Sequence, residues 1–456
     1  MKLYFSSDLC YIKHEEGECN MARKYIKRLF DDVLDFAIQS KGAVVIVGPK
    51  WCGKSTTAAR YARSVIDLMP LDTRDDYIKL AKVSPSEFLN LGEKPILIDE
   101  WQHVSFIWDQ IKYEVDKTGD FGQYILTGSV SDKEKNDLFY TGSRHTGNGR
   151  ITKKMMRTMS LYESGESNGK VSLLDLKNGI FNPCFSEKTI YDYGFYICRG
   201  GWPLSLNVKE EIALAQATEY YEMVVTEDIF SLQEIPLKHD EQRARKVMRS
   251  YSRNISIAAT DETLRKDCIG NDEIFDKDTF AKYLQALRNL YVIEELPAWN
   301  PNLRSKTAIR SGFKRSFVDP SIAVATLGLS PDALLTQLKT FGFIFEQMCI
   351  RDLKSYNPDF NSHISYYRDR YGLEADLVLH LSDGRYALIE CKLGSKEIET
   401  GAEHLNELRT LIKEYNKTEK QVPLREPDLM IILTGGKMAY TRPDGVKIIP
   451  LACLKD

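Results

Sequence analysis

The chain has 456 residues, a length that at ~150 residues per domain predicts about three domains. Its composition, 43% hydrophobic and 28% charged, is ordinary for a globular protein. A net charge of −3 does not indicate nucleic-acid binding, although the basic residues could still be gathered on one face. No stretch approaches the ~20 apolar residues of a membrane span, and the N-terminus lacks the apolar core of a signal peptide, so we expect no membrane partner. The nine cysteines include no Cys-x-x-Cys pair, which argues against a zinc site or a disulfide framework and predicts a cytoplasmic protein with reduced thiols.

A phosphate-binding loop follows the first strongly apolar segment. The Val- and Ile-rich run from Gly42 to Val47 predicts a buried strand of a parallel sheet, and a helix-forming segment begins at Ser55. Between them lies a complete G-x-x-x-x-G-K-[ST] sequence, in the order that lets backbone N–H groups and a helix N-terminus face phosphates. We therefore expect bound ATP, with Lys54 on the β- and γ-phosphates and the Ser55 hydroxyl on Mg²⁺. The predicted nucleotide-binding residues of this loop are Gly48, Pro49, Lys50, Trp51, Cys52, Gly53, Lys54, Ser55 and Thr56.

A second apolar segment ends in two acids. Residues 95–98 predict a short strand, and Asp99 and Glu100 follow it directly. This places carboxylates at the carboxyl edge of a parallel sheet, where ligands of α/β folds bind. We expect Asp99 to hold Mg²⁺, directly or through water, and Glu100 to orient or deprotonate the attacking water.

A third apolar segment, residues 123–126, is followed by Thr127 and Ser129, whose hydroxyls can sense or position a γ-phosphate; Thr127 is our further nucleotide-binding residue. Arg144 and Arg150 come next, in a loop rich in Gly, Ser and Thr. Either arginine acts as an arginine finger, in cis or toward a neighbouring subunit, or both are surface residues. Arg150 is the candidate that we assign to catalysis, with the alternatives left open.

The middle of the chain has helical patterns. One helix is predicted from Glu210 to about Val225, others begin near Glu241 and Asp278, and a β-rich piece spans residues 307–318. Short helices followed by β structure suggest a winged helix, which can bind DNA. Packing between domains explains the same pattern, and we favour it because acids flank Lys277 in the candidate recognition helix. The basic residues that would contact DNA phosphates are Arg243, Arg245, Lys246, Arg249 and Arg253.

Near the C-terminus, strands are predicted at residues 364–368, 374–381 and 385–392. Because side chains alternate along a strand, Glu390 and Lys392 share one face of the last of them. A three-residue loop, with its glycine in a left-handed conformation, would pair Leu381 with Arg385. That register sets Asp376 opposite Glu390, whereas a two-residue turn would send Asp376 to the other face. We predict the three-residue loop, because it brings the carboxylates together.

Two carboxylates and a lysine in one cluster suit a Mg²⁺ ion with a polarised water for phosphodiester cleavage. A further carboxylate, Glu346, falls in a segment that is apolar nearly all round, where it should be buried and in need of a partner. The predicted metal ligands are Glu346, Asp376 and Glu390, and the predicted catalytic pair is Glu390 and Lys392. The alternative for Glu390 and Lys392 is a cross-strand salt bridge, and whether the site cleaves stays open.

Several segments of this chain together form a specific pattern: the phosphate loop, residues 98–102, 126–129, 146–151 and 160–167, Gly200-Gly201-Trp202-Pro203, and Ile389-Glu390-Cys391-Lys392. With these segments the chain resembles the widespread bacterial and archaeal family of predicted AAA-type ATPases that carry a C-terminal domain of unknown function. The resemblance covers residues 25–394 and implies an AAA+-like ATPase core, a winged-helix middle and a C-terminal fold similar to the PD-(D/E)xK nucleases. On that pattern Glu346, Asp376, Glu390 and Lys392 take the metal and catalytic positions; one departure is Ala375, where that pattern has Pro.

We therefore predict an α/β protein with a P-loop AAA-type ATPase domain at 1–195, a helical or winged-helix domain at 196–325 and a PD-(D/E)xK nuclease-like domain at 326–456. The polar stretch Met159–Gly169 is expected to loop over the ATPase core. The expected function is Mg²⁺-dependent ATP hydrolysis coupled to the nuclease-like module, acting on DNA. The alternative is a nucleotide-dependent switch or scaffold whose inactive nuclease fold binds a protein partner; homo-oligomerisation also stays open.

Overall fold

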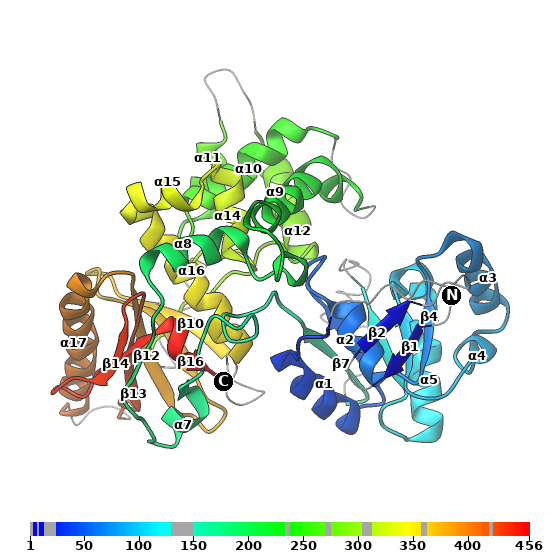
Figure 1. Cartoon of the computed structure of the whole chain (residues 1–456), viewed down its shortest axis with the longest axis horizontal. Coiled ribbons are helices and arrows are strands. Elements are labelled where there is room, and N and C mark those ends of the chain that lie inside the picture. Colours follow the sequence, from blue (N-terminus) through cyan, green and yellow to red (C-terminus); the bar gives the residue numbers. More distant parts are fainter. Residues whose placement is uncertain are drawn as a thin grey trace. The chain divides into compact units, whose positions relative to one another are not determined.

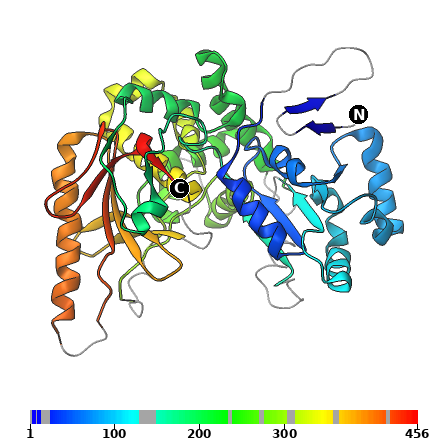
Figure 2. The same cartoon turned by 60° about the horizontal axis from the view of Figure 1, so that its bottom comes forward.

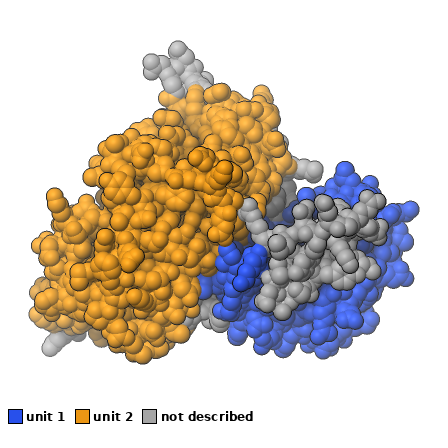
Figure 3. Space-filling view, in the orientation of Figure 1, with its two compact units in different colours: residues 1–48, 53–130, 134–156 blue, residues 49–52, 131–133, 157–456 orange. Residues whose placement is uncertain are grey.

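The computed structural model describes residues 3–6, 9–12, 24–128, 149–232, 238–269, 275–302, 312–356, 363–418 and 423–456. The chain divides into two compact units, shown in separate colours in Figure 3. The first unit comprises residues 1–48, 53–130 and 134–156, and the second comprises residues 49–52, 131–133 and 157–456. None of the helices in the described ranges is long and apolar enough to cross a bilayer.

A five-stranded parallel sheet forms the centre of the first unit (Figure 1). Its strands are β3 (Ala43–Val47), β4 (Ser64–Asp67), β5 (Ile96–Asp99), β6 (Tyr124–Thr127) and β7 (Ile151–Met155). They lie in the order β4–β5–β6–β3–β7, and every neighbouring pair is parallel. The carboxyl ends of all five strands therefore meet at one edge of the sheet.

The helices of the first unit are α1 (Leu29–Ser40), α2 (Lys54–Tyr61), α3 (Leu71–Val83), α4 (Pro85–Phe88), the 3₁₀ helix η1 (Trp101–Ile107) and α5 (Trp108–Thr118). A separate antiparallel pair, β1 (Leu3–Ser6) and β2 (Leu9–Ile12), precedes them.

Local sequence explains the strand–loop–helix unit that begins with β3, which has a neighbouring strand on each side. All five residues of β3 are buried, as expected of a central parallel strand rich in Val and Ile. Gly48 and Gly53 have φ angles of 149° and 98°, which residues with side chains rarely adopt, so these glycines allow the chain to leave β3 and enter α2. The strands predicted before Asp99 and before Thr127 are confirmed as β5 and β6, each of which includes that polar residue as its last.

The second unit begins with a largely helical region. Its helices are α7 (Leu173–Lys177), α8 (Ile190–Arg199), η2 (Pro203–Ser205), α9 (Glu210–Thr226), η3 (Asp228–Phe230), α10 (Glu241–Arg253), α11 (Asp261–Asp267), α12 (Lys277–Asn289), α14 (Pro320–Leu327), α15 (Pro331–Thr336) and α16 (Leu338–Tyr356). After α12, single antiparallel bridges join Ile293 to Phe317 and Leu296 to Lys314. The predicted helices near residues 210, 241 and 278 are thus confirmed. Part of the predicted β-rich piece, residues 307–311, lies outside the described residues.

A seven-stranded mixed sheet follows, ordered β10–β11–β12–β13–β15–β14–β9. Helix α17 (Ile398–Asn416) lies along this sheet, as Figure 2 shows, and packs Ala402 and Leu405 into the same core as Leu388 and Ile432. The strands are β9 (Cys184–Phe185), β10 (His363–Arg368), β11 (Glu374–His380), β12 (Tyr386–Lys392), β13 (Leu429–Thr434), β14 (Met438–Thr441) and β15 (Lys447–Pro450), while β8 (Val171–Ser172) and β16 (Leu454–Lys455) pair separately. Two short 3₁₀ helices complete the unit, η4 (Ser395–Glu397) and η5 (Leu451–Cys453).

The predicted hairpin register is confirmed. Leu377 pairs with Ile389 and His380 with Tyr386, and the Leu381 amide donates to the Arg385 carbonyl at 2.9 Å. Gly384 has a φ of 84°, as the three-residue loop requires. One position before the Leu377–Ile389 pair, this register sets Asp376 opposite Glu390.

The predicted boundary at residue 195 differs from the structure, because the first unit ends at residue 156. Strands β8 and β9 pair with β16 and β14, close to the C-terminus. The stretch Met159–Gly169, expected over the ATPase core, instead binds the second unit: the Leu161 amide donates to Asp352 at 3.1 Å and Arg199 forms an ion pair with Glu166. That prediction was wrong because a polar, glycine-bearing composition does not say which core a segment covers.

Candidate functional sites

The phosphate loop presents Lys54 and Ser55 at the start of α2. Lys54 is only 7% exposed, and its Nζ atom donates to the Gly48 carbonyl at 3.0 Å. The lysine is therefore folded over the loop that would surround a phosphate. The Thr56 side chain is exposed at the same helix end, and Cys52 is fully buried, which fits a small residue filling the loop better than an accessible thiol.

Residues 49–52 are grouped with the second unit. Lys50 Nζ lies 2.6 Å from an Asp228 carboxylate oxygen, so the structure pairs its side chain with an acid. Nucleotide binding by Lys50 stays a prediction. Trp51 has a φ of 65°, and its ring meets that of Tyr220 edge-on at 5.6 Å. Left-handed residues in such a loop help successive N–H groups to point toward an anion.

Three oxygen-bearing side chains converge at the carboxyl edge of the sheet. Asp99 Oδ1 accepts a hydrogen bond from Ser55 Oγ at 2.8 Å and another from Thr127 Oγ1. The structure thus brings together residues that the sequence places in three separate segments. A hydroxyl and a carboxylate oxygen are the ligand types that Mg²⁺ prefers, and this ion usually completes its shell with water and phosphate oxygens. The donor set of Ser55 and Asp99 therefore fits Mg²⁺.

Glu100 directly follows this carboxylate. Its backbone has φ 55° and ψ 44°, a left-handed conformation that is uncommon for a residue with a side chain. The Glu100 carboxylate accepts a hydrogen bond from the Gln102 side-chain amide. Glu100 is thus both strained and tethered, as is frequent at functional sites.

The prediction that Arg150 acts as an arginine finger on its own chain was wrong. Arg150 precedes the first residue of β7, Ile151, which pairs with Ala43 at the beginning of β3. The phosphate loop follows the far end of β3, one strand length or roughly 15 Å away. Arg150 instead forms an ion pair with Asp116. A role toward a neighbouring subunit stays a prediction, while Arg144 and Ser129 lie outside the described residues.

The second predicted site forms a charged cluster in the second unit. Lys392 Nζ lies 2.5 Å from Glu390 and 3.7 Å from Asp376, so the predicted convergence of these side chains is confirmed. Another cation, Lys314, was not predicted. Its Nζ atom lies 2.8 Å from Glu346, 2.9 Å from Glu374 and 3.6 Å from Asp376.

Burial and charge set the ionisation of this cluster. Burial disfavours the Lys314 charge, but the surrounding carboxylates hold the pKa of Lys314 well above its ordinary value. Burial raises the pKa of Glu346 to about 8 despite the neighbouring ammonium. Burial and the Asp376 charge raise the pKa of Glu390 as well. The cluster therefore holds more carboxylates than its two lysines neutralise.

These residues do not fit a resident metal ion. A fully buried ammonium already lies among the oxygens of Glu346, Glu374 and Asp376, and a second cation there would be repelled at short range. Across the described ranges, no three His, Cys, Asp or Glu side chains are arranged to hold a metal. The predicted metal ligands Glu346, Asp376 and Glu390 are thus gathered, but around lysines.

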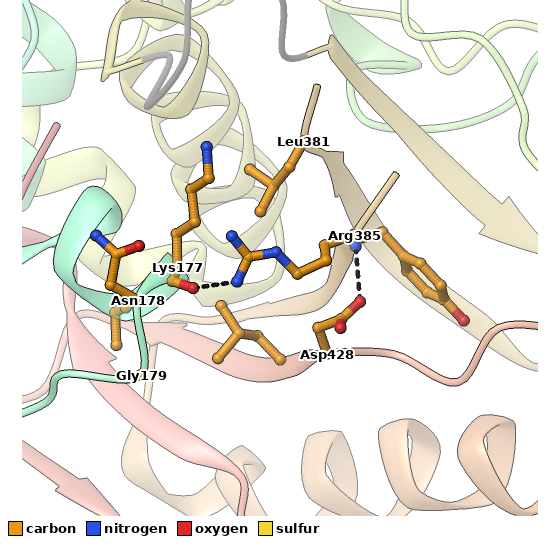
Figure 4. A pocket seen from close by; sticks show the side chains of 9 residues that line it. Lys177, Asn178, Gly179, Leu381, Arg385 and Asp428 are labelled. Atoms are coloured by element: carbon orange, nitrogen blue, oxygen red, sulfur yellow. Dashed lines mark hydrogen bonds between the residues drawn. The ribbon is translucent and has the colours of Figure 1, made fainter. Parts of the chain in front are cut away.

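A separate cavity of about 510 Å³ lies beside the sheet of the second unit (Figure 4). The Arg385 guanidinium extends across it and donates to the Lys177 carbonyl, and Asp428 accepts from the Tyr386 amide at 3.1 Å. Its polar groups bind one another, which fits a structural contact between α7 and the sheet.

Comparisons with known proteins agree with the first site. Residues 40–165 match a family model described as an AAA domain. The phosphate loop lies in an AAA-type P-loop ATPase domain. Residues 190–333 and 341–454 match two further models, each described as a domain of unknown function, DUF8612 and DUF4143. A comparison with curated proteins gave no match.

Among solved structures, a Walker-type ATPase of Pyrococcus abyssi is similar at 14% identity and a TM-score of 0.42, over 65% of this chain and 94% of that one. The Aeropyrum pernix ORC2 protein, in ADPNP–ADP complexes, is similar at 10% identity and a TM-score of 0.26, over 68% of this chain and 92% of that one.

Lys314, Glu374 and Gln102 are the residues that sequence reasoning missed. The available signal for Lys314 was a pair of charges, Lys314 and Arg315, within the strand-like segment Phe313–Val318. For Gln102 the signal was its place in residues 98–102, one of the segments that carry the family resemblance, but the sequence analysis gave Gln102 no role.

Proposed function

We propose that the chain is a Mg²⁺-dependent ATPase whose site is formed by the phosphate loop and the carboxyl ends of β5 and β6. The observation that carries this proposal is the convergence of Ser55, Asp99 and Thr127 beside Lys54. These residues come from three elements and share one sheet edge, which is where ligands of such folds bind.

The roles follow from the chemistry of each group. Lys54 exchanges its contact with the Gly48 carbonyl for the β- and γ-phosphates, and the loop N–H groups surround them. Ser55 and Asp99 would hold Mg²⁺, which when bound neutralises phosphate charge. Glu100 orients the attacking water and accepts its proton, and Thr127 positions the γ-phosphate.

Two substitutions test these roles. Lys54→Ala should abolish binding of a fluorescent ATP analogue, because it removes the cation that faces the phosphates. Glu100→Gln should keep that binding but lower turnover by about 10²–10⁴, the usual contribution of a positioned base. Phosphate release, measured with Mg²⁺ and with EDTA, checks turnover. Parental turnover in Lys54→Ala would contradict the site.

For the second unit we propose a nuclease-like fold that does not cleave. The order α16, β10, β11, β12, α17, β13, with β12 and β13 parallel, supports the fold that the resemblance implies. Lys314 argues against cleavage, because it lies where a metal would have to bind. This favours the alternative, in which ATP binding and hydrolysis control a module that binds a protein partner.

The middle helices fit the same alternative. Helices α10, α11 and α12, followed by the bridged segment, resemble a winged helix in element order. Arg243, Arg245 and Arg253 form ion pairs with acids of the same unit. Basic groups that are already paired make a poor electrostatic footprint for DNA.

A plasmid-nicking assay separates the two candidate functions. We expect no Mg²⁺- or Mn²⁺-dependent nicking of supercoiled DNA by the parent protein, with or without ATP, and therefore no difference from Lys392→Ala. Nicking that is lost in Lys392→Ala would instead establish a coupled nuclease.

A further inference from the structure

We propose that Gln102 is a positioning residue of the ATPase site: it holds the Glu100 carboxylate and offers its own carbonyl oxygen to a water molecule beside it. The inference rests on the proposed ATPase function and assigns a role to a residue that the loop and metal chemistry leave unused.

The first observation is the tether between the two side chains. Gln102 Nε2 donates a hydrogen bond to Glu100 Oε2. Because an ionised carboxylate only accepts hydrogen bonds, the NH₂ end of the amide must face it and the carbonyl oxygen must point elsewhere. Gln102 belongs to η1, whose first residue, Trp101, is buried and packs on Trp108 with ring centroids 5.4 Å apart. The amide that holds Glu100 therefore comes from an anchored turn.

The second observation is an unsatisfied acceptor. Gln102 Oε1 is buried and has no hydrogen-bond partner within the part of the chain that the structure describes. Buried carbonyl oxygens are rarely left without a donor, and a water molecule commonly supplies one. Among the described residues the Gln102 carbonyl oxygen therefore lacks a donor, which a water molecule would supply.

Gly128 locates that oxygen at the nucleotide edge of the sheet. It directly follows Thr127, the last residue of β6, and a Cβ atom built on Gly128 would lie 2.7 Å from Gln102 Oε1. A side chain at position 128 would therefore push the Gln102 amide away. Because Gly128 has no side chain, there is room for the Gln102 amide in this position.

This arrangement has a direct use in hydrolysis. The water oxygen forms a bond to the γ-phosphorus while the bond from that phosphorus to the β–γ bridging oxygen breaks, and ADP leaves with the electron pair. Glu100 receives the proton of the water. With Oε2 of Glu100 engaged by Gln102, the other carboxylate oxygen and Gln102 Oε1 are two acceptors that orient the two O–H groups of one water.

The test compares Gln102→Leu, Gly128→Ala and a matched control, Gln110→Leu. Gln110 also donates its amide to a glutamate, Glu114, at 3.0 Å, but on α5. We expect kcat for ATP to fall at least tenfold in Gln102→Leu and less steeply in Gly128→Ala, with KM and the Kd of a non-hydrolysable analogue unchanged within twofold. Gln110→Leu should match the parent.

The outcomes separate this role from the proposed function. Turnover by the parent and its loss in Glu100→Gln test the ATPase site by themselves. Parental kcat in Gln102→Leu, or a raised KM with kcat unchanged, overturns the positioning role and leaves the ATPase assignment standing. If Gln102→Leu fails to bind the analogue, Gly128→Ala decides, since it displaces the same amide: its kcat falls under the proposal, and a parental kcat overturns it.

Discussion

Replacing Lys314 by methionine should destabilise the second unit strongly. Lys314 is 1% exposed and is the cation nearest to three carboxylates, at 2.8, 2.9 and 3.6 Å. Methionine keeps much of the volume of the side chain but leaves these acids without their common counter-ion. Removing one partner of a buried ion pair costs about 3–5 kcal/mol, because the charge left behind stays desolvated.

The assay is thermal unfolding of the full chain without nucleotide. At about 2 °C per kcal/mol for a unit of this size, Lys314→Met should lower its unfolding temperature by roughly 6–10 °C. Lys413 serves as the control, because it lies 3.5 Å from Glu426 with both side chains about half exposed. Lys413→Met should shift the transition by no more than ~1–2 °C, since exposed pairs contribute about 0–1 kcal/mol.

A double variant tests the cause. Asp376 is the buried partner whose pKa Lys314 helps to lower, so it stays ionised in the parent. In Lys314→Met/Asp376→Asn that charge is absent, so part of the lost stability should return, which would show an energetic coupling between positions 314 and 376. The reasoning is refuted if Lys314→Met unfolds at the parental temperature, or if the second substitution adds to the damage.

Two further predictions concern the buried polar centre of the second unit. Gly201→Ala should destabilise the chain by about 1–3 kcal/mol or prevent folding, because the added Cβ would lie 2.1 Å from the Met159 carbonyl oxygen. The control Gly342→Ala adds a Cβ in open space and should leave the stability unchanged. Soluble yield and thermal unfolding of the two variants check this prediction. Asp319 is buried, which opposes its ionisation, but Arg351 at 3.4 Å and several hydrogen bonds lower the pKa of Asp319 below its ordinary 3.8. Its ionised form therefore stabilises the fold above about pH 4, and this is lost as the pH falls through the lowered pKa. The stability deficit of Asp319→Asn, measured by urea unfolding, should accordingly be largest near pH 7 and shrink on acidification.

The ATPase core was predictable because its signals are local. A run of Val and Ile, a glycine loop and a helix start lie within twenty residues, and Asp99 and Thr127 each end an apolar strand. The hairpin register could be predicted as well, since loop length alone decides whether Asp376 faces Glu390. Long-range strand pairings could not be predicted. Strands β8 and β9 pair with strands more than 250 residues later, and their composition does not indicate which strands these are.

The two corrections at the sites have similar causes. Arg150 was assigned because it lies in a loop rich in Gly, Ser and Thr. Since β7 runs parallel to β3, however, Arg150 lies at the edge of the sheet opposite to the phosphate loop. Lys314 belongs to a segment whose burial depends on contacts with α16 and β11, so its place among carboxylates emerges only in the folded chain. Local pattern thus predicted that Glu346, Asp376, Glu390 and Lys392 would gather, and missed Lys314 and Glu374.

The most direct test of the central claim is a single-turnover measurement with excess enzyme, Mg²⁺ and radiolabelled ATP, comparing the parent with Glu100→Gln. The account predicts that both proteins bind ATP with similar affinity, that the parent converts it to ADP and phosphate, and that Glu100→Gln retains it uncleaved for at least a hundredfold longer. Equal cleavage rates in the two proteins would contradict the assigned site.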